Sequence, residues 1–177
     1  MDTLTILDKQ FKISITEKEI LEAVKNVANQ LNFDLKNKEV VFLGILNGAF
    51  MFVSDLMKHI EIPVQISFLK VASYEGTATT GKVKQLIGVN ENIENKTVVI
   101  LEDIVDTGYT MQQIIADVQK YNPGEIRIAT LLFKPTALKV PVNIDYVAIT
   151  IPDDFVVGYG LDYEGFGRNL NAIYTVI

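Results

Sequence analysis

The sequence contains no cysteine and only one histidine. Without cysteine the chain can form no disulfide, use no thiolate nucleophile and build no cysteine-ligated zinc site. The single histidine, His59, falls in an amphipathic stretch, where we expect it to pack or face solvent rather than to act in catalysis. Thiol chemistry and disulfide cross-links are therefore excluded.

Long apolar runs are also missing. No segment reaches the about 20 apolar residues that a membrane-spanning helix needs. The first ten residues, MDTLTILDKQ, lack the basic start and the long apolar core of a secretory signal peptide. We therefore expect a soluble cytoplasmic protein with no membrane partner.

Positive charge is scarce relative to negative charge. The 177 residues include 16 Lys and Arg against 22 Asp and Glu, which gives a formal net charge of −6. This balance argues against a nucleic-acid-binding surface but allows a small basic pocket for a polyphosphate. A hydrophobic content of 49% suffices for one well-buried core, so we expect a single domain over residues 1–177.

The most informative stretch is VVILEDIVDTGYT, residues 98–110. Thr97–Leu101 is a short apolar run typical of a strand buried on both faces of a parallel sheet. Glu102 and Asp103 are then expected at the carboxyl end of that strand. In open α/β sheets, ligands bind outside these strand ends, and the start of the next helix offers backbone N–H groups to anions.

The turn after this strand supplies groups for a phosphate. Thr107 and Thr110 offer hydroxyls, and Gly108 allows a close backbone approach. Because successive side chains of a strand point in opposite directions, Glu102 and Asp103 need not do the same job. Either carboxylate can reach sugar hydroxyls or a hydrated Mg²⁺. Asp106, nearer the turn, is the better candidate for proton transfer. The stretch therefore predicts a site for a phosphorylated sugar and a divalent metal.

Strands and helices are expected to alternate along most of the chain. Thr16 and Glu19 form a capping-box pattern at the start of the first helix. We expect helices at 17–31, 49–60 and 110–121, and strands at 40–46, 64–71, 83–89, 97–101, 126–133 and 146–151. This order predicts an α/β fold with a central, mostly parallel sheet flanked by helices. Residues 155–177 fit the alternation poorly and are expected to form a loop-rich cap.

A glycine pattern in that cap resembles part of a dinucleotide-binding motif. Gly158-Tyr159-Gly160 has the first two glycines at the right spacing, but the third is displaced. No strand-turn-helix pattern surrounds the glycines, and this context is what the motif requires. We therefore do not expect a nicotinamide or flavin dinucleotide site.

Residues 98–110 resemble the phosphoribosyl pyrophosphate (PRPP) motif of type I phosphoribosyltransferases, in which two acidic residues precede a D-T-G-x-T loop. Further blocks occur in the order seen in hypoxanthine-guanine phosphoribosyltransferases: Leu46-Asn47-Gly48-Ala49, Ser73-Tyr74, Leu132-Phe133-Lys134-Pro135 and Ile151–Leu170. The resemblance covers roughly residues 40–177. It implies the type I phosphoribosyltransferase fold, with a small hood of C-terminal and N-terminal segments over the site.

The resemblance also implies an activity, the transfer of the 5-phosphoribosyl group from PRPP to N9 of hypoxanthine or guanine with release of pyrophosphate. Mg²⁺ is the implied cofactor, and a homodimer or homotetramer is the implied assembly. Asp106 would accept or relay a purine proton. The implied PRPP and phosphate ligands are Asn47, Gly48, Glu102, Asp103, Asp106, Thr107, Gly108, Tyr109, Thr110 and Arg168. The implied purine ligands are Lys134, Phe155, Val156 and Asp162. Ser73 and Tyr74 are the implied pair on a mobile loop that closes over the site. The implied metal ligands are Glu102, Asp103 and Asp162.

The chain departs from the family at Asn47 and Tyr109, positions where lysine is common in relatives. Losing the lysine before Gly48 removes a positive charge but keeps the backbone donors of that loop, and it leaves open whether the loop contains a cis peptide. Two alternative functions are a regulator that senses PRPP to control RNA or DNA, and an enzyme of the same fold that acts on xanthine or a pyrimidine. The regulator would need a basic face or an added DNA-binding domain, and neither is evident.

Overall fold

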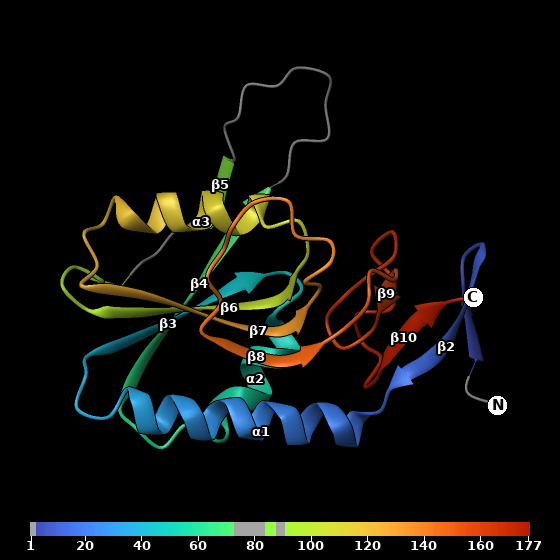
Figure 1. Cartoon of the computed structure of the whole chain (residues 1–177), viewed down its shortest axis with the longest axis horizontal. Coiled ribbons are helices and arrows are strands. Elements are labelled where there is room, and N and C mark those ends of the chain that lie inside the picture. The colour runs from blue at the N-terminus through green and yellow to red at the C-terminus, as the bar shows by residue number, and fades with distance from the viewer. Residues whose placement is uncertain (1–2, 73–83, 88–90) are drawn as a thin grey trace.

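The structure is a computed structural model that describes residues 3–72, 84–87 and 91–177. In these residues a six-stranded sheet carries helices on both faces, and a smaller four-stranded sheet lies beyond one end of it (Figure 1). Ser73 and Tyr74, which were expected on a loop that closes over the site, lie outside the described residues.

The six-stranded sheet contains the strands that the apolar runs predict. Its strand order is β5-β4-β3-β6-β7-β8, and all neighbours are parallel except β4 and β5. The strands are β3 (Val40–Leu46), β4 (Val64–Ala72), β5 (Lys84–Ile87), β6 (Thr97–Val105), β7 (Glu125–Phe133) and β8 (Tyr146–Thr150). The prediction of an α/β fold with a mostly parallel central sheet is therefore confirmed.

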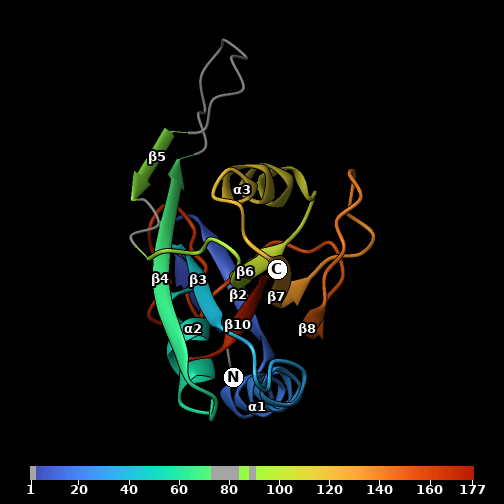
Figure 2. The same ribbon diagram turned by 90° about the vertical axis from the view of Figure 1, so that its left-hand side faces the viewer.

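Helices cover both faces of this sheet, as Figure 2 shows: α1 (Glu17–Asp34) and α2 (Phe50–Met57) lie on one face and α3 (Tyr109–Gln119) lies on the other. The predicted capping box starts α1, since Glu19 N donates to Thr16 Oγ1 and Thr16 N donates to the Glu19 carboxylate at 2.8 Å. One core cluster lies beneath α1 and α2 and another beneath α3, so the central strands are buried on both faces.

Several element boundaries differ from the prediction. β6 continues to Val105, opposite Phe133 of β7, so Glu102 and Asp103 lie inside the strand rather than after it. β5 runs antiparallel to β4, which agrees with the prediction of a sheet that is mostly, not wholly, parallel. α2 ends at Met57, three residues before the predicted end. In the described ranges no helix is both long and apolar enough to cross a membrane.

Both ends of the chain form the second sheet, which is antiparallel with the order β1-β2-β10-β9. Its strands are β1 (Thr3–Ile6), β2 (Lys9–Ile15), β9 (Val156–Val157) and β10 (Ile173–Val176). We call residues 3–15 and 155–177 the hood. It lies beyond the carboxyl ends of β7 and β8 (Figure 1). The sequence interpretation predicted a hood but not its sheet, although Phe11, Ile13 and Ile15 alternate with polar residues as a half-buried strand requires.

Candidate active site

Three neighbouring strands of the central sheet are each followed by a charged residue. Asp106 directly follows β6, Lys134 directly follows β7, and Asp153 comes shortly after β8. The backbone N–H of Lys134 donates to the carbonyl of Val105 at 3.0 Å and ties the first two strand ends together. Because the strands are parallel neighbours, their carboxyl ends meet at one edge of the sheet, where ligands bind in folds of this class.

The Lys134 ammonium lies between two carboxylates. Its Nζ is 3.6 Å from Asp106 Oδ2 and 3.4 Å from Asp153 Oδ1. The Lys134 side chain is only 8% exposed, whereas those of Asp106 and Asp153 are 45% and 61% exposed. A buried cation needs nearby anions to offset its lost hydration, and the two carboxylates provide them. Of the two contacts only the one to Asp153 is a hydrogen bond, so the ammonium keeps a donor free for an acceptor on a ligand.

β6 carries two adjacent carboxyl groups that lie close together, and Asp103 N donates to Glu102 Oε1 at 3.2 Å. Glu102 is buried, and this burial together with the neighbouring Asp103 charge raises the pKa of Glu102 well above its ordinary value. Asp103 is only partly buried, and its Oδ1 accepts a hydrogen bond from Ile104 N at 2.9 Å. The two residues therefore differ in their surroundings: Glu102 is buried and has a raised pKa, whereas Asp103 is partly exposed.

The tight loop that follows β3 contains Asn47 and Gly48, and we call it the β3 loop. It packs against Asp103. The Leu46–Asn47 peptide in this loop is cis. A Cβ atom on Gly48 would overlap the Asp103 carboxylate, and a Cβ atom on Gly160 of the hood would overlap the carbonyl oxygen of Gly48. Glycine at both positions permits this close approach. The packing brings the β3 loop, the end of β6 and the hood to one place.

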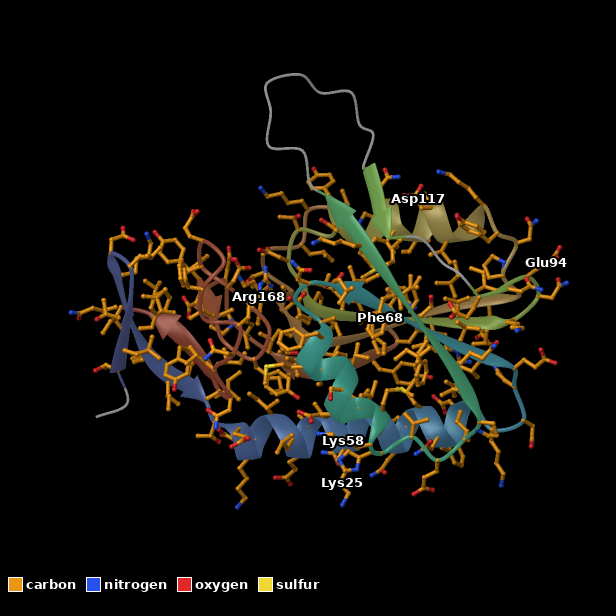
Figure 3. The ribbon with its side chains drawn as sticks, turned by 180° about the vertical axis from the view of Figure 1, so that it is seen from behind. Lys25, Lys58, Phe68, Glu94, Asp117 and Arg168 are labelled. Atoms are coloured by element: carbon orange, nitrogen blue, oxygen red, sulfur yellow. The ribbon has the colours of Figure 1, made fainter. Side chains whose placement is uncertain are left out.

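The hood contributes an ion pair beside this loop. Arg168 Nη2 lies 2.6 Å from Asp162 Oδ1, and Arg168 Nη1 donates to the carbonyl of Gly160 at 2.7 Å. Asp162 also accepts a hydrogen bond from Gly165 N at 2.7 Å. Figure 3 shows Arg168 between the hood and the central sheet. Because Gly160 also touches Gly48, this guanidinium is held next to the β3 loop and keeps further donors for an anion.

The turn before α3 presents backbone donors. Gly108 is the residue before the helix and has a left-handed conformation, with φ of +89°. Lys139 N donates to the Thr107 carbonyl at 3.0 Å and fixes the turn from outside. No side chain caps this end of α3, and its first turn has no acidic residue. Tyr109 and Thr110 are exposed there. An uncapped helix start with free N–H groups and nearby hydroxyls suits a phosphate.

An aromatic cluster in the hood supports Phe155. Its ring centroid lies 6.3 Å from that of Phe11 and 5.8 Å from that of Tyr163, which stands at 84° to it. The Tyr163 hydroxyl donates to Asp8 Oδ1 at 2.7 Å, so the supporting ring is itself held in place. Phe155 is 44% exposed, which leaves part of its ring for a planar ligand, while the next residue, Val156, is buried.

Tyr159 fastens the hood to the central sheet. Its hydroxyl donates to Asp55 Oδ2 of α2 at 2.6 Å, and its ring belongs to the core beneath α1 and α2. Burial, reinforced by the Asp55 carboxylate, raises the pKa of this phenol above its ordinary value. The neutral hydroxyl therefore stays a donor, and the segment that carries Asp162 and Arg168 is anchored at its start.

The predicted metal ligands occupy two parts of the site. Asp103 packs against the β3 loop and Asp162 lies in the hood, whereas Glu102 is buried next to Asp103. Within residues 3–72, 84–87 and 91–177, no three acidic or histidine side chains form a cluster that holds a metal by itself. A cation at this site would therefore need ligand oxygens from a bound molecule as well.

Three residues of the site were missed by the sequence interpretation. Asp153 is one of two adjacent aspartates after β8, and nothing local shows which of them turns towards Lys134. Tyr163 follows the predicted ligand Asp162, but its contact with Phe155 joins two segments of the hood. Phe11 lies in a strand that the alternation of apolar residues indicates.

Comparisons with known proteins place this site among relatives. Residues 14–164 match the phosphoribosyl transferase domain. The chain is 42% identical over 166 residues to the hypoxanthine-guanine phosphoribosyltransferase of Staphylococcus aureus strain Mu50, with 93% of each chain covered. It is 42% identical over 161 residues to that of Streptococcus pyogenes serotype M3, which covers 90% of this chain and 89% of the relative. A crystal structure of a hypoxanthine phosphoribosyltransferase from S. aureus superposes with a TM-score of 0.88 and 42% identity, covering 94% of this chain and 91% of that chain.

Proposed function

The chain belongs to the phosphoribosyltransferase family, and we propose that it is a hypoxanthine-guanine phosphoribosyltransferase of purine salvage. In this reaction the 5-phosphoribosyl group of PRPP moves to N9 of a 6-oxopurine, and pyrophosphate leaves. The bond from N9 to the anomeric carbon forms as the bond to pyrophosphate breaks. The observation that carries the proposal is the arrangement of Asp106, Lys134 and Asp153 at three adjacent strand ends, with the exposed ring of Phe155 two residues after Asp153.

The acceptor base fits between Lys134 and Phe155. A 6-oxo group accepts a hydrogen bond, so it pairs with the free donor of Lys134; the 6-amino group of adenine is a donor and would leave the ammonium poorly paired. Phe155 supplies a face for stacking on the purine, and Val156 supplies backbone groups near the purine edge. Asp106 then lies near enough to Lys134 to take the proton that the purine ring loses.

PRPP fits on the other side of the site. The turn from Thr107 to Thr110 would bind the 5-phosphate through backbone N–H groups and hydroxyls. The β3 loop with Asn47 and Gly48 would bind pyrophosphate through its backbone, and Arg168 would donate to the same group. Glu102 and Asp103 would hold the ribose hydroxyls as positive charge develops at the anomeric carbon.

We propose Mg²⁺ as the cofactor, because the donor set fits that ion. Mg²⁺ is usually bound by one or two carboxylates together with phosphate oxygens and waters, so a cluster of three carboxylates is not required. Asp103 and Asp162 are partly exposed, and they are the residues that would hold the ion with pyrophosphate. Asp103 packs against Gly48, and Asp162 comes two residues after Gly160, which packs against the carbonyl of Gly48. When bound, the ion neutralises charge on the leaving pyrophosphate. Glu102 is buried, so it is the least accessible of the predicted metal ligands.

We further propose that residues 1–177 act as one domain in the cytoplasm and assemble as a homodimer or homotetramer. The central sheet and the hood share the core through Tyr159 and Ile173, which supports one folding unit. Gel filtration with light scattering measures the assembly.

A PRPP-dependent assay with a panel of bases tests the proposed function. Hypoxanthine and guanine are expected to yield nucleotides in the presence of Mg²⁺, and adenine and uracil are expected to yield none. Removing divalent cations with EDTA should abolish turnover, and adding Mg²⁺ should restore it. Turnover of xanthine or uracil alone would instead identify another acceptor. Absence of every nucleotide product, together with tight nucleic-acid binding, would favour the regulator.

Replacing Arg168 by glutamine is expected to lower kcat/KM for PRPP by about 10- to 100-fold, the effect of losing charge-assisted hydrogen bonds to an oxyanion. The KM for hypoxanthine should change much less. Arg168 is held next to the β3 loop, where pyrophosphate would bind, whereas the purine would bind at Lys134. Arg127→Gln is the matched control, since Arg127 also forms an ion pair, with Glu125 at 2.7 Å, but at the start of β7. Equal effects of the two substitutions on KM for PRPP would contradict the assigned role.

A further inference from the structure

Asp153 has no part in the mechanism above, yet its carboxylate lies closer to the Lys134 ammonium than that of Asp106 does. We propose that Asp153 is a positioning residue for the acceptor base: it holds the Lys134 ammonium away from Asp106 and in place for the 6-oxo group. The inference rests on the proposed function, since it assigns the residue that prepares Lys134 for a 6-oxopurine.

The sheet topology sets the two carboxylates on opposite sides of the ammonium. Asp106 follows β6, Lys134 follows β7 and Asp153 follows β8, and these strands are neighbours in that order. Both N···O distances, 3.6 Å and 3.4 Å, exceed the about 2.7–2.9 Å of a tight charge-assisted hydrogen bond. The ammonium therefore contacts both carboxylates but forms a tight ion pair with neither of them.

The contact of the ammonium with two carboxylates affects both Asp106 and Lys134. If Lys134 formed a tight pair with Asp106 alone, the nearby positive charge would lower the affinity of the Asp106 carboxylate for the purine proton. The same pair would turn an ammonium donor away from the 6-oxo group. The Asp153 carboxylate also attracts the ammonium, so Lys134 is not drawn onto Asp106 and keeps its position for the 6-oxo group.

The chain provides a matched control in the next residue. Asp154 is exposed, carries the same charge and has no side-chain hydrogen bond or ion pair with the part of the chain that the structure describes. Phe155 follows Asp154. The short segment after β8 therefore contains both Asp153 and the aromatic ring proposed to stack on the purine. Comparing Asp153→Asn with Asp154→Asn separates the contact with Lys134 from a general loss of negative charge.

Steady-state kinetics of Asp153→Asn give the first test. We expect KM for hypoxanthine to rise about ten-fold, as for a weakened hydrogen bond from a charged donor, with KM for PRPP unchanged. Asp154→Asn should leave both constants unchanged. Asp153→Glu, which keeps the carboxylate, should retain most of the hypoxanthine affinity. Thermal unfolding of each variant shows that the folded protein is being compared.

Product binding gives a second test that a merely structural role would not move. The wild-type protein is expected to bind inosine monophosphate more tightly than purine riboside 5′-monophosphate, which lacks only the 6-oxo group. Asp153→Asn should lose most of this preference by weakening the inosine monophosphate complex alone. An unchanged preference, an equal rise in KM for PRPP, or the same loss in Asp154→Asn would overturn the proposal. Failure of the wild-type protein to use hypoxanthine is a different outcome, because it overturns the proposed function itself.

Discussion

Replacing Asp106 by asparagine should lower kcat for hypoxanthine by about 10²- to 10³-fold, which is the range expected for loss of a positioned proton acceptor. Asparagine keeps the size of the side chain but cannot accept the purine proton. The backbone donors of the turn and the Arg168 guanidinium are untouched, so KM for PRPP should change little. Steady-state kinetics with each substrate varied in turn measure both effects.

A carboxylate at the other end of the molecule serves as the control for this substitution. Glu94 is exposed and lies far from Arg168 and the hood, as Figure 3 shows. Glu94→Gln removes one negative charge, as Asp106→Asn does, and should leave kcat unchanged. Near-normal turnover in Asp106→Asn would remove Asp106 from the proton-transfer step.

Lys134→Gln is expected to lower kcat/KM for hypoxanthine by at least about 100-fold, because it removes a buried ammonium that serves both the 6-oxo group and two carboxylates. Glutamine still offers an amide donor but no charge, so Asp106 and Asp153 then face each other without a cation between them. The advantage of hypoxanthine over adenine should shrink, because the charged donor that favours a 6-oxo acceptor is gone. The base panel measures this ratio directly.

The same loop offers a control lysine. Lys139 is exposed, and its contact with the site is a backbone hydrogen bond to Thr107, which substitution of the side chain leaves in place. Lys139→Gln should therefore keep both the rate and the choice of base. If Lys134→Gln retained the full preference for hypoxanthine, the donor to the 6-oxo group would have to be sought elsewhere.

Much of the central sheet could be predicted from the sequence because its signals are local. The apolar run at Val40–Leu46 and the capping box at Thr16 and Glu19 each specify an element from residues within a few positions of one another. The limits of β6 could not be set in this way. Its last residues are strand because β7 lies alongside and pairs with them as far as Phe133.

The hood shows the same division between local and distant information. Its glycines and aromatic residues were correctly read as a cap, but β2 pairs with β10 from the opposite end of the chain. A short strand such as β9, with only Val156 and Val157, has too few residues for a periodic pattern. Partner strands that are distant in the sequence stabilise these pairs, so their positions follow from the fold as a whole.

By itself, the sequence determined which chemical groups are present and the local order in which they occur. The acidic pair, Asp106 and the Thr- and Gly-rich turn lie within thirteen consecutive residues, 98–110, and they indicate a PRPP site before any contact is known. Tertiary structure decided which distant groups meet: Lys134 with Asp153, Gly48 with Asp103, and Phe155 with Tyr163. The physical reason is that such contacts depend on strand order and on burial of a shared core, which no short stretch of sequence encodes.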